Sequence, residues 1–310
     1  MWKYVLKRIL LMIPVLLGVT VFIFLIMELS PGDPASAILG AGATQEAIDL
    51  LNHELGYDRP AIVRLLDYIV GVFTRFDFGT SYITRMPVLD SILPAIPVSI
   101  QVAFNAVVFS VVIGVPIGIL SAVKQYSLLD TIPTVTSLFL SALPGFWLGM
   151  VLLYVFALKL GWVPSYGIDS WKCFILPMIS LGLPYAAQEM RFTRSSMLDT
   201  IRTDYVRTAR AKGAAERRVI WRHALQNALL PVITVTGTNF AAMLGGAVVT
   251  ESLYTIPGIG TQLVTAIKLK DTPSVMGCTF ILAALCSFIL LCVDLMYAVV
   301  DPRIKAKYSK

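Results

Sequence analysis

The sequence predicts an all-α integral membrane protein with six transmembrane helices and a small extracytoplasmic subdomain between the first two. Of its 310 residues, 57% are hydrophobic and only 14% are charged, and the mean hydropathy is +0.77. A soluble core needs less apolar sequence than this, and the apolar residues fall into runs long enough to cross a bilayer. The net charge of +6 therefore bears on membrane orientation, and we expect no nucleic acid partner.

The first predicted span is residues 9–29. At about 1.5 Å per residue this run covers roughly 30 Å, the thickness of a hydrocarbon core, and no small-residue cleavage site closely follows it. The run predicts a retained helix, so residues 1–29 form a cytoplasmic N-terminus and transmembrane helix 1.

Residues 30–95 predict a folded extracytoplasmic subdomain. The segment has turn signals, beginning with Pro31-Gly32-Asp33-Pro34, and helical stretches at 45–55 and 61–73. It lacks the charge bias and low complexity of a disordered tail.

Five further spans follow, and with the loops between them they form a permease core over residues 96–300. Prolines in or beside several of these spans predict kinked helices around a cavity. The predicted spans are 96–122, 132–158, 174–190, 229–250 and 275–300.

Orientation follows from the distribution of Lys and Arg. Most of the 25 basic residues lie in the segments that include both termini and residues 191–222. Basic residues concentrate on the cytoplasmic side of a membrane, so both termini, including the tail 301–310, are predicted to be cytoplasmic.

The basic cytoplasmic segment 191–228 reads as two amphipathic helices separated at Gly213. Its charge could be only a consequence of topology, a patch for anionic lipid headgroups, or a docking surface for a cytoplasmic partner. Gly213 could provide a sharp turn that lets a partner approach, or an ordinary helix C-cap.

Few ionisable residues lie within the spans. Asp294 is expected to pair with an arginine at the cytoplasmic end or to cap backbone groups, and Glu189, which precedes two arginines, is expected to do the same. Glu28 and Glu251 are expected at outer helix ends, within reach of solvent.

Polar, uncharged side chains in the middle spans are candidates for lining a pathway, because such walls let cargo pass without tight binding. Interhelical hydrogen bonding is the alternative role for each of them. These candidates are Gln101, Asn105, Ser137, Ser141 and Asn239.

The stretch Pro257-Gly258-Ile259-Gly260 interrupts the outer side between the last two spans. It predicts a re-entrant turn that gates the outer mouth, with Pro257, Gly258 and Gly260 as gate residues; a plain surface loop is the alternative.

Nothing in the sequence predicts a metal site or catalytic residues. The four cysteines form no CxxC pair, and the only histidines are His53 and His223. There is no HExxH motif, no paired intramembrane aspartates, no GxSx serine in a span and no phosphate-binding loop.

The basic segment resembles the EAA loop of ABC importer permeases, and most closely that of the dipeptide, oligopeptide and nickel permease family. RTARAKG at 207–213 and the closing Leu230-Pro231 match the loop pattern, with Arg207 in place of its Glu. Further stretches resemble the same family in order along the chain: SPGDP at 30–34, ELGYDRP at 54–60, FDFGTS at 76–81, ESLYTIPGIGTQLVTAI at 251–267 and VDLMYAVVDPRIK at 293–305.

The resemblance implies a type I ABC importer permease fold in the prokaryotic cytoplasmic (inner) membrane. The partners it implies are a second related permease, two cytoplasmic ATPases, an extracytoplasmic substrate-binding protein and membrane lipid. ATP and Mg would be bound by the ATPases, with no cofactor in this chain. The implied ATPase-coupling residues are Arg207, Thr208, Ala209, Arg210, Ala211, Lys212, Gly213, Ala214, Ala215, Glu216 and Arg217.

The cargo implied first is a dipeptide or oligopeptide, with nickel chelates or glutathione-like compounds as alternatives. A rival from another class is a secondary transporter driven by an ion gradient. Such folds tend to show repeated halves and intramembrane carboxylate clusters, and the sequence shows neither.

Overall fold

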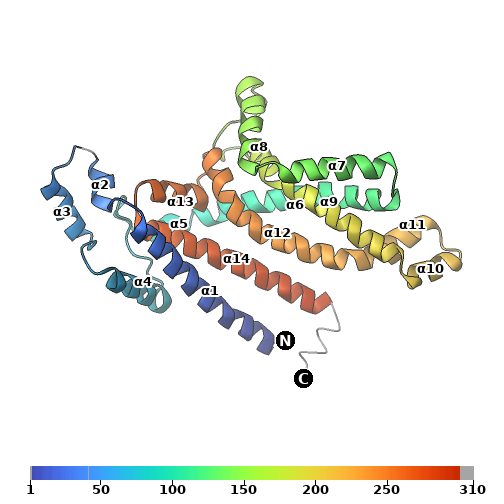
Figure 1. Ribbon diagram of the computed structural model, residues 1–310, viewed down its shortest axis with the longest axis horizontal. Coiled ribbons are helices and arrows are strands. Elements are labelled where there is room, and N and C mark those ends of the chain that lie inside the picture. Colours follow the sequence, from blue (N-terminus) through green and yellow to red (C-terminus); the bar gives the residue numbers. More distant parts are fainter. Residues whose placement is uncertain (1, 41, 301–310) are drawn as a thin grey trace.

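The computed structural model describes residues 2–40 and 42–300, and these are helical throughout apart from turns and one isolated bridge between Thr80 and Pro87 (Figure 1). The long helices run side by side, with α10 and α11 at the end of the bundle where the chain begins, and α2 to α5 and α13 at the opposite end. The elements are α1 (Trp2–Leu29), α2 (Pro34–Leu39), α3 (Gln45–Glu54), α4 (Ala61–Arg75), α5 (Val88–Ile92), α6 (Ala95–Val123), α7 (Leu128–Ala142), α8 (Gly145–Leu152), the π-helix η1 (Leu153–Lys159), the 3-10 helix η2 (Trp171–Phe174), α9 (Ile175–Ile201), α10 (Asp204–Ala211), α11 (Glu216–Arg218), the π-helix η3 (Val219–Ala224), α12 (Leu225–Leu253), α13 (Ile259–Lys268) and α14 (Thr272–Val300).

Four continuous helical stretches in the described part of the chain are long and apolar enough to cross a membrane. They are Val5–Leu29, Val88–Val123, Glu216–Leu253 and Thr272–Met296. A fifth, predicted as one span over 132–158, is broken: α7 and the α8–η1 helix meet at 98°. Pro144 stands at the break, where it disfavours helical backbone in the residue before it, and Leu143 is extended.

Helix α9 covers the remaining predicted span, 174–190, and continues to Ile201. It is too polar to qualify as a span by hydropathy alone. Its packing against α6 explains how it is accommodated, because Gly114 and Gly118 let the two backbones touch. A Cβ at Gly114 would lie 2.5 Å from the carbonyl oxygen of Ala186, and one at Gly118 would lie 2.6 Å from that of Met190. Small residues four apart permit this close packing of membrane helices.

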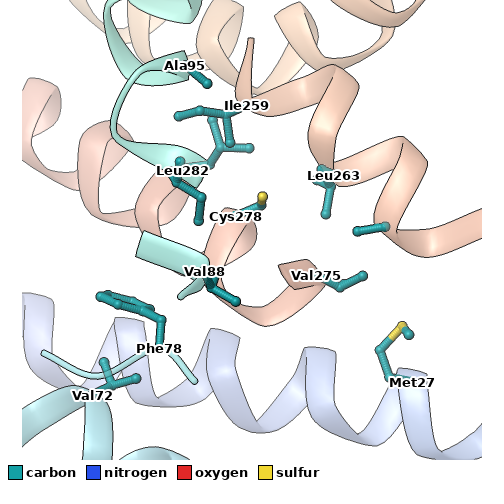
Figure 2. Close-up of a cluster of buried hydrophobic side chains, with 12 residues drawn as sticks. Met27, Val72, Phe78, Val88, Ala95, Ile259, Leu263, Val275, Cys278 and Leu282 are labelled. Atoms are coloured by element: carbon teal, nitrogen blue, oxygen red, sulfur yellow. The ribbon is translucent and has the colours of Figure 1, made fainter. Parts of the chain in front are cut away.

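The chain between α4 and α6 is attached to the bundle by a shared apolar core (Figure 2). Phe78, Val88 and Ile92, which follow α4 in the chain, pack with α13 and α14 residues such as Ile259 and Cys278. The helical stretches predicted at 45–55 and 61–73 are confirmed as α3 and α4.

Asp271, just before α14, adds directional bonds to this attachment. Its carboxylate is buried and accepts from the Ser81 hydroxyl at 2.6 Å, the Tyr82 backbone N–H at 3.0 Å and the Ser274 hydroxyl at 2.7 Å. The loop after α4 is thus tied to the start of the last long helix.

Two of the expectations for isolated carboxylates are confirmed. Asp294 forms the predicted ion pair with an arginine, Arg8 of α1, at 2.9 Å. Glu28 is exposed and pairs with Arg64 of α4 at 2.7 Å.

Candidate functional site

The predicted coupling segment forms a helical tip at one end of the bundle (Figure 1). The boundaries differ from the sequence prediction in two ways. The single helix predicted before Gly213 is divided in two, because α9 ends at Ile201 and α10 starts at Asp204. The second helix does not stop at residue 228, since helical structure continues from Glu216 to Leu253.

Gly213 ends α10 with a Schellman motif. Its N–H donates to the Arg210 carbonyl at 2.9 Å, and the Ala214 N–H reaches back to the Ala209 carbonyl at 3.3 Å. Gly213 has φ of +76°, and nothing lies within 4 Å of where a Cβ would stand. Left-handed backbone geometry alone therefore favours glycine here. The C-cap weighed from the sequence is confirmed, and the approach of a partner to this turn stays a prediction.

An apolar underside fixes the tip to the bundle. Val206 of α10 is fully buried together with Val219 and Ala224 of η3, and they pack against Met197 of α9. The tip is also continuous with α12 through η3, so movement of the tip would be passed to α9 and α12.

The outer face of the tip is cationic and exposed. Arg210 forms an ion pair with Glu216 across the Gly213 turn, with an Nη2 to Oε1 distance of 2.7 Å. The hydrogen bond to Glu216 raises the pKa of Arg210 above its ordinary value, so this guanidinium stays charged. Several basic side chains on this face have no acidic partner within the described residues: Lys212, Arg217, Arg218 and Arg222.

Arg194, near the tip on α9, makes a bidentate ion pair with Asp130 of α7. The distances are 2.5 Å from Nε to Oδ1 and 2.8 Å from Nη2 to Oδ2. Asp130 is buried and also accepts from the Ser121 hydroxyl and the Tyr126 N–H. This network joins α6, α7 and α9 close to the coupling segment.

The prediction that Glu189 pairs with a nearby arginine is wrong. Glu189 is fully buried, and its Oε1 accepts from the Asn239 side-chain amide of α12 at 2.9 Å. Arg191 and Arg194 point to other partners because α9 rotates successive residues by about 100° around its axis.

Beside α9 lies a cleft of about 590 Å³, bounded by residues 141–146 at the α7–α8 break, 180–191 of α9 and 246–250 of α12. Of the predicted pathway residues, Ser141 lines this cleft. Ser137 is buried next to it, and its carbonyl accepts from Arg191 at 3.4 Å.

The other pathway candidates lie elsewhere. Asn239 makes the interhelical hydrogen bond to Glu189 that the sequence left as its alternative role. Gln101 is exposed and Asn105 is half-buried on α6, and neither lines the cleft. Gln188 and Arg191 do line the cleft and were not predicted. Arg191 was assigned to the cytoplasmic segment, and Gln188, an uncharged residue of the predicted span 174–190, was not among the candidates.

At the predicted outer gate, the chain turns into α13 instead of forming a plain surface loop. Pro257 is exposed, but Gly258 and Gly260 are buried. The expectation that solvent reaches Glu251 is wrong, because this residue is only 1% exposed. Its Oε2 accepts from the Gly260 N–H at 2.7 Å, and the Ser99 hydroxyl accepts from the Ile259 N–H at 2.9 Å.

The glycines of this turn make room for that carboxylate. A Cβ at Gly258 would lie 2.3 Å from Oε2 of Glu251, and one at Gly260 would lie 2.8 Å from the same atom. Glu251 therefore fixes the first turn of α13 from the end of α12, where a negative charge also suits the helix N-terminus.

The arrangement of the helices indicates the class of protein. Long apolar helices around a cleft are typical of a multi-pass membrane protein, and no group of His, Cys, Asp or Glu within its described part could hold a metal ion.

Two known protein families match the sequence. Residues 114–306 match the family described as "Binding-protein-dependent transport system inner membrane component", and residues 1–103 match the corresponding N-terminal family. The chain belongs to this family of ABC permeases, which implies ATPase and substrate-binding protein partners.

Curated relatives match over nearly the full length. The "Glutathione transport system permease protein GsiC" of Salmonella typhimurium is 39% identical over 307 residues, which is 99% of this chain and 100% of the relative. The protein of the same name from Escherichia coli K12 is 38% identical with the same coverage.

Solved structures support the type I importer fold. A chain of the inward-facing MetNI methionine ABC transporter is 16% identical, has a TM-score of 0.56, and covers 69% of this chain and 97% of its own length. A chain of an amino acid ABC transporter gives 14% identity and a TM-score of 0.53, and covers 69% of this chain and 94% of its own length.

Proposed function

We propose that this chain is the translocating subunit of an ATP-driven importer of peptide-like cargo in a prokaryotic cytoplasmic membrane. It crosses the membrane six times, with α9 as the span that hydropathy alone does not identify, and both termini face the cytoplasm. A second related permease completes the pathway. Two cytoplasmic ATPases bind ATP and Mg and supply the energy, and an extracytoplasmic binding protein delivers the cargo.

The observation that carries this proposal is the construction of the tip around Gly213. A buried apolar underside holds α10 and η3 to the bundle, while the basic outer face is left exposed. A coupling element needs this combination, because it must present a surface to a partner and move with the membrane helices. Residues 207–217 form the contact with the ATPases in this proposal.

Force applied to the tip would reach the membrane by two routes. One is the continuous helix from Glu216 to Leu253, and the other is α9, which contacts both α10 and η3. Both helices border the cleft, so their relative movement would change its access. At the far end of α12, Glu251 would carry the movement to the gate residues Pro257, Gly258 and Gly260.

For the cargo, we propose a small peptide, with glutathione as the first compound to test. Glutathione is itself a tripeptide, and the relatives at 38% to 39% identity are named glutathione permeases. A dipeptide or longer oligopeptide fits the same proposal. A nickel chelate is the second candidate and would be recognised through its organic groups.

The experiment is reconstitution of the four-component assembly, with its binding protein, into lipid vesicles. We expect uptake of labelled glutathione or of a dipeptide against its gradient only when ATP and both ATPases are present. Vesicles with the two permeases alone serve as the control. Uphill uptake by the permeases without ATPases, or driven by an imposed proton or sodium gradient, would overturn the proposal in favour of a secondary transporter.

A further inference from the structure

Arg191 is a charged residue in the wall of the cleft. It lies on α9, ten residues before the end of this helix, and reaches α7 near the break at Leu143 and Pro144. Its Nη1 donates to the Ser141 hydroxyl at 2.9 Å and to the Ser137 carbonyl at 3.4 Å. The guanidinium is therefore half-buried in the wall of the cleft and is not part of the tip around Gly213.

Within the described part of the chain, no carboxylate pairs with Arg191. Arg194, one turn further along α9, differs in this respect, because its guanidinium forms a bidentate ion pair with Asp130. The carbonyl and hydroxyl at the C-terminal end of α7 offset only part of the charge of Arg191, since a helix terminus carries about half an elementary charge. An arginine without a counter-ion in a membrane helix is costly, and such residues mark ligand pathways.

The rest of the cleft suits an anionic organic group. Gln188 and Tyr185 add polar groups on the same helix, and Gly145 and Gly246 keep the opposite walls small. A planar guanidinium binds carboxylates through paired hydrogen bonds, and three of its five N–H donors remain after the two bonds to α7. The volume of about 590 Å³ is in the range of small-molecule sites.

We propose that this cleft is an anion-selective station on the pathway, where Arg191 holds a carboxylate of the cargo during passage. The inference rests on the proposed function, and it narrows the cargo to compounds with a free carboxylate. The Arg191–Ser141 bond keeps the guanidinium in place when the site is empty. Arg191 binds the cargo, whereas Arg194 positions helices.

The test measures the electrostatic preference of the cleft in the assembled transporter. Gly145→Cys places a thiol in the cleft, and a Cβ there makes only ordinary contact, at 3.7 Å from the Ser180 carbonyl. Its reaction rates are compared for two methanethiosulfonate reagents of similar size, one with a sulfonate and one with a trimethylammonium group. Leu50→Cys, exposed on the outer subdomain, is the matched control, and the chain without an added cysteine gives the background.

We expect the sulfonate reagent to react about tenfold faster than the cationic one at Gly145→Cys, relative to Leu50→Cys, since a positive cleft concentrates anions. Arg191→Lys should keep this preference and Arg191→Gln should abolish it. S-methylglutathione, which retains both carboxylates and has no free thiol, should slow the reaction, and its diethyl ester should not. Protection should disappear in Arg191→Gln.

The same ratio of sulfonate to trimethylammonium rates at Gly145→Cys as at Leu50→Cys, or a preference unchanged by Arg191→Gln, would overturn the inference. Lack of reaction with either reagent, with and without ATP, would also overturn it, because cargo could not reach the cleft. These rates do not depend on uptake. A failure of ATP-driven transport with an anion-selective cleft would therefore refute the proposed function and not the selectivity of the cleft.

Discussion

The two ends of the bundle differ in the burial of their charged side chains. At the outer end, Glu251 and Asp271 are buried and bind backbone N–H groups or hydroxyls. At the opposite end, which we propose is cytoplasmic, basic side chains such as Arg217 and Arg222 are exposed, and apolar side chains beneath them are buried. Directional bonds thus set the geometry of the turn before α13, the predicted outer gate. Apolar burial holds the cytoplasmic tip and leaves its charges available to a partner.

The largest effect should come from placing a charge in the underside of the tip. Val206→Asp puts a carboxylate where the side chain is fully buried among apolar residues, at a cost of about 3 kcal/mol or more. We expect a lower unfolding midpoint for the purified chain and loss of ATPases on co-purification. Differential scanning fluorimetry and subunit stoichiometry measure the two effects.

Tyr205→Asp is the matched control, because the same charge is added one residue away at a side chain that is 45% exposed. It should leave the unfolding midpoint close to that of the parent, because surface substitutions usually change the free energy of unfolding by no more than about 0.5 kcal/mol. Equal destabilisation by both variants would show that the apolar underside does not hold the tip.

At the outer end, the sharpest change is Glu251→Ala. It leaves the buried Gly260 N–H without its acceptor, which costs about 1 to 3 kcal/mol. Glu251→Gln retains a carbonyl oxygen in the same place and should lose much less. If unfolding measurements gave the two variants the same stability, the carboxylate bond would not be what fixes the start of α13.

A smaller effect is expected at the turn of the tip. Gly213→Ala forces a side chain into left-handed backbone at φ of +76°, for a loss of about 1 to 2 kcal/mol. Gly245→Ala in α12 is the control: nothing lies within 4 Å of the added Cβ, no positive φ is involved, and alanine there should be neutral or stabilising. The thermal unfolding midpoint should fall in Gly213→Ala and should stay the same or rise in Gly245→Ala.

Much of the fold could be predicted from hydropathy and turn residues. The first span, the helices of the outer subdomain and the turn at Gly213 all follow from local patterns. An arginine partner for Asp294 could also be predicted, although not that it would be Arg8, because an isolated charge near a helix end needs a partner.

The wrong predictions depended on contacts that the neighbouring residues in the sequence do not reveal. Nothing local to Glu251 indicates that the chain returns nine residues later to bury it, or that Glu189 faces α12 and not the arginines beside it in sequence. Two features of the sequence could have improved the prediction. Gly114 and Gly118 have the four-residue spacing of a close helix contact, and the uncharged-wall assumption removed Arg191 from the pathway candidates.

The central claim, that ATPases engage the cytoplasmic tip, is tested most directly by photo-crosslinking in the assembled transporter. A benzophenone amino acid is placed at Lys212 in the tip and, in a separate variant, at Leu50 in the outer subdomain; both positions are exposed. We expect a crosslink from Lys212 to an ATPase subunit and none from Leu50. Absence of an ATPase crosslink at Lys212, with the complex intact, would contradict this claim.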